Sequence, residues 1–248
     1  MVTVKRLDVF LVEKKIFATR SRARDAVVRQ TVKINGKIAF KAGQMVHDDA
    51  EVVVCDPAQN YVSRAALKLI SALDTFPIIT TKVTAIDVGA SAGGFTQVLL
   101  ERGAAHVIAV DVGHGQFDAR LSGNSAITLL EGLNVRDLKQ EHLGGHEIDL
   151  IVSDVSFISL KLALPPALFL AKKGAQAVLL VKPQFEIGRG NIDNGRILKD
   201  PLMTKKIAEE LFGWLNTQIG WKAKGLLPSP IAGGDGNLEY LLFGEKQE

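Results

Sequence analysis

Residues 150–154 read Leu-Ile-Val-Ser-Asp, and residues 177–182 read Ala-Val-Leu-Leu-Val-Lys. Such continuous runs of Val, Ile and Leu are typical of strands in a parallel sheet that is covered on both faces. In an open α/β sheet, ligands bind outside the carboxyl ends of the strands. Asp154 and Lys182 therefore fall where chemistry takes place. Because desolvating either charge alone is costly, the two residues predict an enzyme site.

The chain from Tyr61 onward surrounds this pair with a doubly wound sheet. Predicted strands and helices alternate there, which is the pattern of a sheet with helices on both faces. The predicted fold class is α/β, with a Rossmann-like sheet of seven strands. Strands are expected at 83–88, 105–110, 127–130, 148–153, in the run that ends at Lys182, and at 221–227 and 238–243. Helices are expected at 94–103, 160–171 and 201–219.

A further helix is predicted just after Tyr61, at the start of this region. Ser63 is expected to cap it, with its apolar side chains turned inward at Leu67, Ile70 and Leu73. Arg64 and Lys68 lie four residues apart and are expected together on the outward face. Seen alone, Lys68 therefore has the pattern of an ordinary surface lysine.

The first part of the chain has a different pattern. Residues 5–17 predict a short amphipathic helix, and a second helix begins near Thr19 or Ser21, either of which can cap it. Asn35-Gly36 between two alternating segments is a strong signal for a β-hairpin. Residues 51–55 are expected to form one more strand. These elements predict a small α+β domain.

We divide the chain accordingly into a small domain at 1–55, a linker at 56–60 and a large domain at 61–248. Residues 1–46 hold 11 Lys and Arg against 3 Asp and Glu, whereas residues 60–248 hold 19 against 20. A basic arm on a near-neutral body is typical of a protein that binds a polyanion, and the local structure favours nucleic acid. The expected RNA-binding residues are Arg6, Arg20, Arg22, Arg24, Lys33, Asn35, Lys37 and Arg64.

The composition excludes several classes of protein. The 248 residues contain one cysteine, Cys55, so neither a disulfide framework nor a cysteine-based zinc cluster is expected. The five histidines show no metal-ligand spacing, and we predict no metal site. Neither a leader at Met1 nor an apolar run of the roughly 20 residues that span a membrane is evident. A cytoplasmic protein without a membrane partner is expected.

The segment from Asp87 to Phe95 reads Asp-Val-Gly-Ala-Ser-Ala-Gly-Gly-Phe and follows the first strand of the large domain. Its glycines allow the backbone to turn tightly and to approach a ligand. Asp111 ends the next strand, where a carboxylate can bind ribose hydroxyls. The spacing departs from G-x-G-x-x-G, and the acidic residue before Gly89 suits S-adenosylmethionine better than a nicotinamide dinucleotide.

Four charged residues of alternating sign come from separate elements: Lys68, Asp154, Lys182 and Glu239. If the last strand is antiparallel, Glu239 reaches the same edge of the sheet and lies beside Lys182. Such a set suits methyl transfer to a ribose 2′-hydroxyl, with Lys182 as the base once desolvation and a second cation favour its neutral form. The carboxylates would orient the lysines and balance their charge. The simpler interpretation is a group of surface ion pairs.

Taken together, these motifs resemble those of a known family. The motifs of the chain are similar to those of the TlyA family of ribosomal RNA 2′-O-methyltransferases, some of which are called hemolysins, and its large domain resembles the FtsJ-like methyltransferases. The matching stretches span nearly the whole chain: residues 61–64, 87–96, 109–113, 153–160, 181–186 and 229–239. Residues 5–41 resemble an RNA-binding module that a ribosomal protein also contains.

The resemblance implies an enzyme that uses S-adenosylmethionine to methylate a cytidine ribose in ribosomal RNA, with ribosomal subunits as partners. The family's catalytic tetrad falls on Lys68, Asp154, Lys182 and Glu239. The implied donor-binding residues are Asp87, Gly89, Ala90, Ser91, Gly93, Gly94, Phe95, Asp111, Val112, Asn134 and Asp154.

Three departures accompany the resemblance. Ala65-Ala66 and Gln30-Thr31 stand where the family usually has glycine, which affects the expected contacts with RNA, and Asn134 replaces an aspartate of some FtsJ-like enzymes. The segment 188–191 is interpreted as a loop whose Arg189 reaches phosphate or solvent. Alternatives remain open: a noncatalytic RNA-binding or ribosome-assembly factor, a membrane-active hemolysin and, less favoured, a nicotinamide enzyme.

Overall fold

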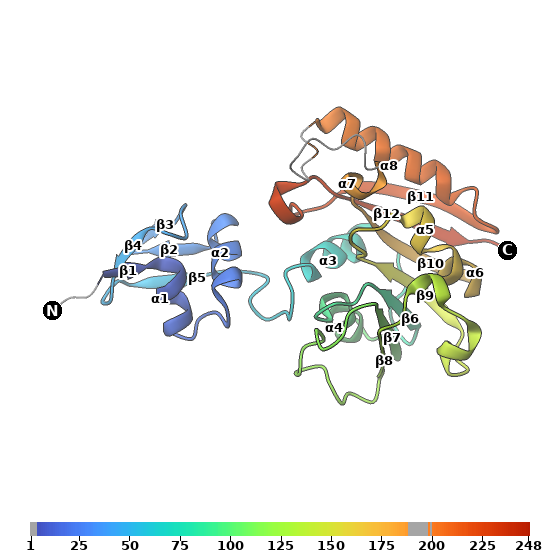
Figure 1. The fold of residues 1–248 in the computed structure, drawn as a ribbon, viewed down its shortest axis with the longest axis horizontal. Helices are drawn as coiled ribbons and strands as arrows, with labels where there is room; N and C mark the ends of the chain where they lie inside the picture. Colours follow the sequence, from blue (N-terminus) through green and yellow to red (C-terminus); the bar gives the residue numbers. More distant parts are fainter. Residues whose placement is uncertain (1–3, 188–197, 199) are drawn as a thin grey trace. The chain divides into compact units, whose positions relative to one another are not determined.

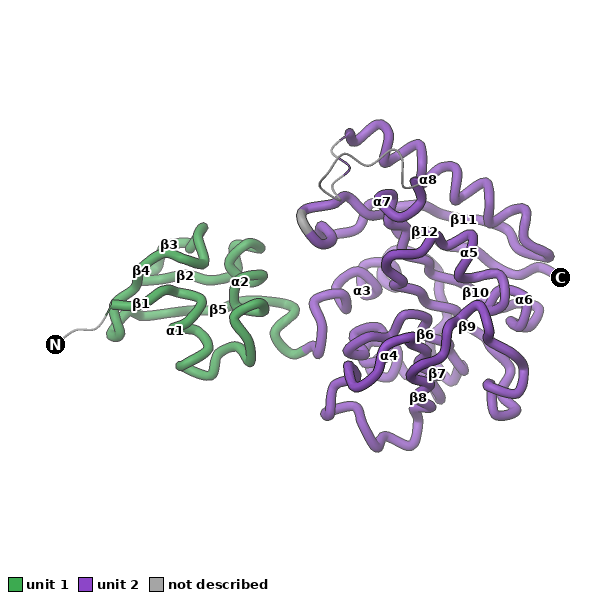
Figure 2. The backbone as a smooth tube through the Cα atoms, in the orientation of Figure 1, with its two compact units in different colours: residues 1–60 green, residues 61–248 purple. Residues whose placement is uncertain are grey.

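The computed structural model of the protein describes residues 4–187, 198 and 200–248. The chain forms two compact units, residues 1–60 and 61–248 (Figure 2). Each unit has its own hydrophobic core. The segment around Arg189 lies outside the described residues.

The small unit combines two helices with two small antiparallel sheets. One sheet pairs β1 with β4, and the other has the order β3-β2-β5. The elements are β1 Val4–Arg6, α1 Leu7–Glu13, α2 Arg20–Val28, β2 Val32–Ile34, β3 Lys37–Ile38, β4 Met45–His47 and β5 Val52–Val54.

Two features of this unit agree with the predictions from the sequence, and one differs from them. Thr19 caps α2, accepting from the backbone N–H of Arg22 at 3.3 Å. Asn35 and Gly36 both adopt positive φ, at 47° and 78°, and turn β2 into β3 as predicted. The first helix begins only at Leu7, because Val4–Arg6 pairs as a strand with Met45–His47.

The large unit contains a seven-stranded sheet of order β11-β12-β10-β9-β6-β7-β8 (Figure 1). Five neighbouring strands, β10, β9, β6, β7 and β8, are parallel to one another. Strand β12 is antiparallel to both of its neighbours, β10 and β11. This arrangement confirms the predicted fold class. The strands are β6 Thr84–Val88, β7 His106–Asp111, β8 Ile127–Glu131, β9 Ile148–Ser153, β10 Ala171–Val181, β11 Trp221–Pro228 and β12 Tyr240–Lys246.

Helices cover both faces of this sheet. Alternate strand residues divide into two cores, one shared with α5, α6 and α8 and the other with α3 and α4. The predicted helix at 160–171 is two helices, because Pro165 begins a new one. The helices are α3 Ala66–Thr75, α4 Gly94–Glu101, α5 Leu160–Ala163, α6 Pro165–Leu170, α7 Pro183–Glu186 and α8 Pro201–Leu215, with 3-10 turns at Val135–Asp137, Gln140–Leu143 and Gly234–Gly236. In the described part of the chain, no helix combines the length and apolar character needed to cross a membrane.

The predicted orientation of α3 was wrong. The helix begins at Ala66, and the Ser63 hydroxyl accepts from the Ala65 N–H at 3.2 Å instead of capping the helix. Its fully buried face carries Ala66, Leu69 and Ala72, while Leu67, Ile70 and Leu73 are only partly buried. Lys68, expected to face outward, is 6% exposed. The cause is a buried partner from the far end of the chain, described below.

Candidate active site and nucleic-acid interface

The strand order reverses between β6 and β9. The glycine loop that follows β6 and the residue Asp154 that follows β9 meet at this point. Val88 and Ser153 are register partners, and the Asp154 N–H donates to the Val88 carbonyl at 3.0 Å. The glycine loop after β6 and the segment after β9 therefore start side by side. This switch point is where an α/β sheet opens a crevice for a ligand.

Two glycines of the loop are required by their surroundings. Gly89 has φ +84°, and a Cβ there would lie 3.1 Å from the carbonyl carbon and oxygen of Asp154. Gly93 has φ +90°, and a Cβ would lie 2.6 Å from Leu121 and 2.8 Å from Phe117. Side chains are disfavoured at both positions by backbone and by space. Gly89 lets the loop pass directly over the start of the segment that follows β9, and Gly93 lets it pack against Phe117 and Leu121.

A pocket of about 440 Å³ opens at this switch point. The Asp111 carboxylate lies in its wall and accepts from the N–H groups of Ser91 and Gly113, each at 2.7 Å. Six predicted donor-binding residues line it: Gly89, Ser91, Asp111, Val112, Asn134 and Asp154. Phe157, which sequence reasoning expected near the site as a residue that can stack on a base, also lines it. The other lining residues were not assigned to the site: Val88, Val110, Gln116, Leu133, Val135, Val155, Ser156 and Ile158.

A second, smaller pocket of about 150 Å³ shares part of this lining. Lys182 lines it, together with four more predicted donor-binding residues, Asp87, Ala90, Gly94 and Phe95. Gly89, Ser91, Asp154 and Ser156 line both pockets. Gly93 lines neither, so its part is to shape the loop.

Asp87 is fully buried beneath the loop. Its Oδ2 accepts from the Thr96 hydroxyl at 2.7 Å, whereas its Oδ1 has no hydrogen-bond partner among the described residues. The pKa of the Asp87 carboxyl is raised from 3.8 to about 7, mainly by burial and also by the nearby charge of Asp154, while the hydrogen bond from Thr96 opposes the shift. The site therefore holds a buried acceptor that lacks a donor.

Lys182 and Asp154 form a close pair where the two pockets meet. The Lys182 Nζ lies 2.6 Å from Asp154 Oδ1, and their side chains are 10% and 17% exposed. The same Nζ lies 2.7 Å from the Ser156 hydroxyl and 3.4 Å from the Asp154 carbonyl oxygen. The charges predicted from the strand ends are thus in direct contact.

Glu239 reaches the same edge of the sheet but has a different partner from the one predicted. The antiparallel register pairs Val181 with Tyr240, so Lys182 and Glu239 follow and precede paired strand ends. Glu239 nevertheless contacts Lys68, Nζ to Oε2 at 2.6 Å. A Cβ at Gly233 would lie 2.0 Å from Glu239 Oε1, so the preceding loop leaves space for this carboxylate. The tetrad is two ion pairs, Lys182–Asp154 and Lys68–Glu239.

In the small unit, three of the predicted RNA-binding arginines gather around one carboxylate. Asp8 is fully buried at the start of α1. Arg6 Nε and Arg20 Nη2 donate to it at 3.0 and 2.9 Å, and Arg24 Nη2 lies 3.8 Å away. Hydrogen bonding from Arg6 lowers the pKa of Asp8 to about 2, against the effect of burial. The three guanidinium side chains stay about half exposed, so the carboxylate orients cations that solvent can reach.

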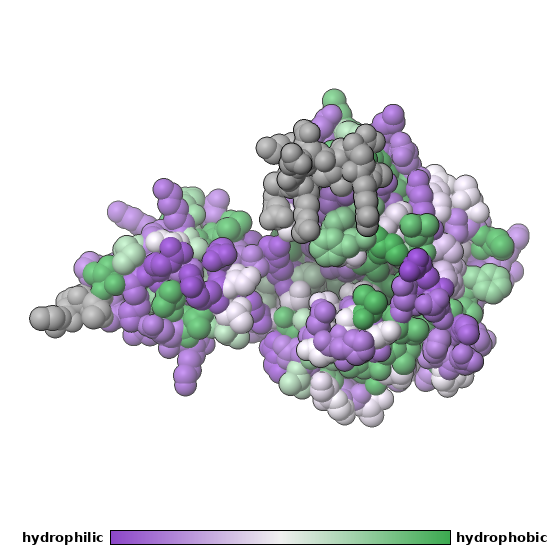
Figure 3. Space-filling model, in the orientation of Figure 1, coloured by the Kyte–Doolittle hydropathy of each residue, from purple (hydrophilic) through white to green (hydrophobic). Residues whose placement is uncertain are grey.

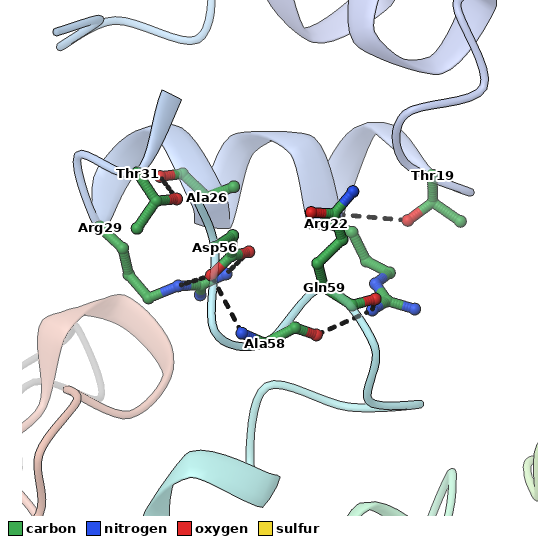
Figure 4. A network of polar contacts seen from close by, with 8 residues as sticks. All are labelled: Thr19, Arg22, Ala26, Arg29, Thr31, Asp56, Ala58 and Gln59. Atoms are coloured by element: carbon green, nitrogen blue, oxygen red, sulfur yellow. Dashed lines mark hydrogen bonds and ion pairs between the residues drawn. The ribbon is translucent and has the colours of Figure 1, made fainter. Parts of the chain in front are cut away.

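Two other predicted RNA-binding residues have structural contacts. Arg22 donates to the carbonyls of Ala58 and Gln59 at 3.2 and 3.1 Å, as Figure 4 shows. Asn35 accepts from the Glu51 N–H at 2.9 Å. Arg29, also on this side of α2, forms a bidentate ion pair with the buried Asp56. The segment predicted as a linker is therefore held against α2.

The remaining predicted RNA-binding residues lie on the surface or beside the smaller pocket. Lys33 and Lys37 are exposed on the hairpin. Arg64 lies between Ser63 and Ala65, which both line the smaller pocket. Figure 3 shows that hydrophilic side chains dominate the visible face of the small unit. These features give the small unit a basic, accessible surface.

Comparisons with known proteins cover nearly the whole chain. It is 41% identical over 239 residues to the 16S/23S rRNA (cytidine-2′-O)-methyltransferase TlyA of Mycobacterium tuberculosis, covering 96% of this chain and 88% of that protein. It is 35% identical over 254 residues to the 23S rRNA (cytidine-2′-O)-methyltransferase TlyA of Campylobacter jejuni, covering 94% and 97%. A solved structure from Streptococcus thermophilus, provisionally named a hemolysin, has a TM-score of 0.76 and 37% identity and covers 99% of this chain and 89% of its own.

The strand order and the pocket at the switch point define the class of Rossmann-like methyltransferases. The FtsJ-like methyltransferase family matches residues 61–246, and the S4 domain matches residues 5–52. The chain belongs to the TlyA family.

Proposed function

We propose that this protein transfers a methyl group from S-adenosylmethionine to the ribose 2′-hydroxyl of a cytidine in ribosomal RNA. The observation that carries the proposal is the Lys182–Asp154 pair, 2.6 Å apart where the two pockets meet. Relatives that cover nearly the whole chain are named for this reaction, which supports the substrate class.

The residues of the two pockets fit S-adenosylmethionine. The buried Asp87 Oδ1 lacks a donor, and an ammonium group supplies one. The Asp111 carboxylate suits ribose hydroxyls, and the apolar residues Val112, Leu133 and Val135 suit a nucleobase beside the Asn134 amide. When bound, S-adenosylmethionine supplies an electrophilic methyl group on a positively charged sulfur.

Lys182 is proposed as the base that takes the proton of the acceptor hydroxyl. A lysine can do this only as the neutral amine. Asp154 holds the Nζ in place through its carboxylate and its carbonyl oxygen, so the nitrogen is already positioned when a hydroxyl arrives. Lys68 and Glu239 form the second ion pair of the tetrad and support its charge balance.

The small unit is proposed to bind the phosphates of ribosomal RNA. Arg6, Arg20 and Arg24 present three partly exposed guanidinium groups around the single charge of Asp8. Guanidinium groups that are oriented in advance suit phosphate oxygens. We therefore assign ribosomal RNA or an assembled subunit as the partner.

The test measures transfer of labelled methyl groups from S-adenosylmethionine to naked ribosomal RNA and to each isolated ribosomal subunit, followed by mapping of 2′-O-methylated cytidines. Lys182→Ala is expected to lower transfer by at least about 100-fold, as loss of a positioned base does, while calorimetry still detects donor binding. Lys172→Ala is the matched control, because Lys172 pairs with Asp149 at the opposite end of the sheet and is 42% exposed.

Three outcomes contradict the proposal. If wild-type protein binds ribosomal RNA but methylates neither RNA nor subunits, a noncatalytic RNA-binding factor is the better interpretation. If transfer occurs at a base instead of a ribose, the assigned acceptor is wrong. Lysis of red cells by purified protein free of RNA would favour the hemolysin interpretation.

A further inference from the structure

Lys182 already has three oxygen neighbours in the structure. Its Nζ lies 2.6 Å from Asp154 Oδ1, 2.7 Å from Ser156 Oγ and 3.4 Å from the Asp154 carbonyl oxygen. An ammonium group has three N–H donors. The Nζ thus forms an ion pair with Asp154 Oδ1 and donates to the Ser156 hydroxyl and the Asp154 carbonyl, so a ribose hydroxyl that takes the position of either oxygen must replace a hydrogen bond.

The three neighbours are not equally easy to replace. Two belong to Asp154, whose carboxylate forms the ion pair and whose carbonyl is part of the backbone beside β9. The third is the neutral hydroxyl of Ser156, on a residue that is exposed. Ser156 is thus the partner that Lys182 loses at the lowest cost.

Ser156 also lies in the right place for an exchange. It lines both pockets, whereas Lys182 lines only the smaller one. The serine hydroxyl therefore lies at the junction of the lysine and the larger pocket. It has the same chemistry as a ribose 2′-hydroxyl, since either accepts from an ammonium and donates to a neutral amine.

We propose that the Ser156 hydroxyl occupies the position of the acceptor hydroxyl on Lys182 in the free protein and is replaced by the ribose 2′-hydroxyl when RNA binds. The inference rests on the proposed function and adds a positioning residue to it. The exchange forms one hydrogen bond and breaks another, with no covalent step and no net transfer of a proton.

This exchange has a consequence for substrate affinity. In the wild-type protein the 2′-hydroxyl gains Lys182 but displaces Ser156, so the hydroxyl adds little to RNA binding. Without the serine hydroxyl, the 2′-hydroxyl fills an empty position on Lys182 and contributes its full hydrogen bond. Hydrogen bonds to charged groups correspond to about tenfold to 100-fold in affinity.

The experiment compares two forms of one ribosomal RNA fragment that contains the mapped target cytidine, with a 2′-hydroxyl or a 2′-deoxyribose at that position. Dissociation constants are measured for the full-length protein with S-adenosylhomocysteine present, so that no transfer occurs. The variants are Ser156→Ala, Ser156→Thr, which keeps a hydroxyl, and Ser125→Ala as a control at an exposed serine outside both pockets.

The expected result is a preference for the 2′-hydroxyl form that is at least about threefold larger in Ser156→Ala than in wild type, with Ser156→Thr and Ser125→Ala close to wild type. Equal preferences in all four proteins would overturn the inference. So would a 100-fold fall in the transfer rate of Ser156→Ala with an unchanged preference, which would indicate a proton relay. Equal weakening of both RNAs would indicate a structural role. Failure of the proposed function is distinct, because wild-type protein would then transfer no methyl group.

Discussion

The ammonium of Lys68 lies 2.6 Å from the carboxylate of Glu239, across 171 positions of sequence, and both side chains are buried. One residue lies on α3 and the other directly before β12. A buried ion pair is rarely more stabilising than apolar residues of similar volume, because both charges lose their hydration. Its presence beside the strand end that carries Lys182 therefore favours a role in function over one in stability.

Removing one partner of this pair should destabilise the fold more than removing both. Glu239→Ala leaves a buried lysine without its counter-charge, and we expect the free energy of unfolding to fall by about 3–5 kcal/mol. The double variant Lys68→Met, Glu239→Leu should stay within about 1 kcal/mol of wild type while losing methyl transfer. Urea unfolding and the transfer assay measure the two quantities.

The exposed pair Arg102–Asp74 supplies the control for that comparison. Its atoms lie 2.7 Å apart, but the side chains are 40% and 54% exposed. Asp74→Ala should change stability by no more than about 1 kcal/mol. A double variant at 68 and 239 that keeps full transfer would show that the pair is structural.

The raised pKa of Asp87 predicts a pH-dependent loss of stability. Because the folded protein holds this proton up to about pH 7 while the unfolded chain releases it near pH 3.8, the free energy of unfolding should fall as pH rises between these values. Asp87→Asn removes the titration and resembles the protonated carboxyl. The variant should therefore gain stability relative to wild type by about 2–3 kcal/mol more at pH 8 than at pH 5.

The same substitution should weaken the binding of S-adenosylmethionine, since an amide cannot supply the negative charge for an ammonium. Chemical unfolding at the two pH values and calorimetry with the methyl donor give both readouts. An equal difference between variant and wild type at pH 5 and pH 8 would argue against a perturbed Asp87.

Two glycines with the same strain but different surroundings separate backbone conformation from ligand approach. Gly89 and Gly115 have φ of +84° and +64°, but a Cβ at 89 would lie 3.1 Å from the Asp154 backbone whereas a Cβ at 115 meets nothing within 4 Å. Alanine at 115 should cost about 1–2 kcal/mol from backbone conformation alone, and alanine at 89 should cost more because its Cβ also meets the Asp154 backbone. Only Gly89→Ala should also weaken donor binding, measured by calorimetry. Equal loss of binding in both variants would contradict the proposed role of Gly89 in donor binding.

The strand-end residues were predictable because a local rule places them. A buried apolar run ends at the carboxyl edge of the sheet, so Asp154 and Lys182 followed from the sequence. The orientation of Lys68 did not, because helical spacing reports only neighbours within one or two turns, and Glu239 lies 171 positions away. Ser156 follows β9 in a segment without periodicity, and no pattern marked it as a pocket residue.

The short strands show the same limit. Val4–Arg6 and Met45–His47 contain three residues each, too few for an alternating pattern to stand out, and only their pairing identifies them. Arg22 was assigned to RNA from its charge, whereas its contacts with Ala58 and Gln59 depend on how the chain returns to α2. Charge along a helix indicates a class of partner, and individual roles need the tertiary contacts.

This distinction between arginines of one helix can be tested directly. Arg20 contacts Asp8 and is 53% exposed, so Arg20→Ala should weaken RNA binding and reduce the dependence of log affinity on log salt by about one unit. Arg22→Ala leaves the carbonyls of Ala58 and Gln59 without this donor, so residues 56–60 should become more sensitive to limited proteolysis.

Filter binding across a salt series and proteolysis followed by mass spectrometry measure these effects on the full chain. Asp56→Asn is a second variant for the proteolysis experiment. It weakens the contact between Asp56, which lies on this segment, and Arg29 at the end of α2, without removing side-chain volume. If Arg22→Ala reduced the salt dependence as much as Arg20→Ala and left the proteolysis pattern unchanged, Arg22 would have to be assigned to the RNA. Opposite responses in the two assays would separate the phosphate contact on α2 from the contact that holds the following segment.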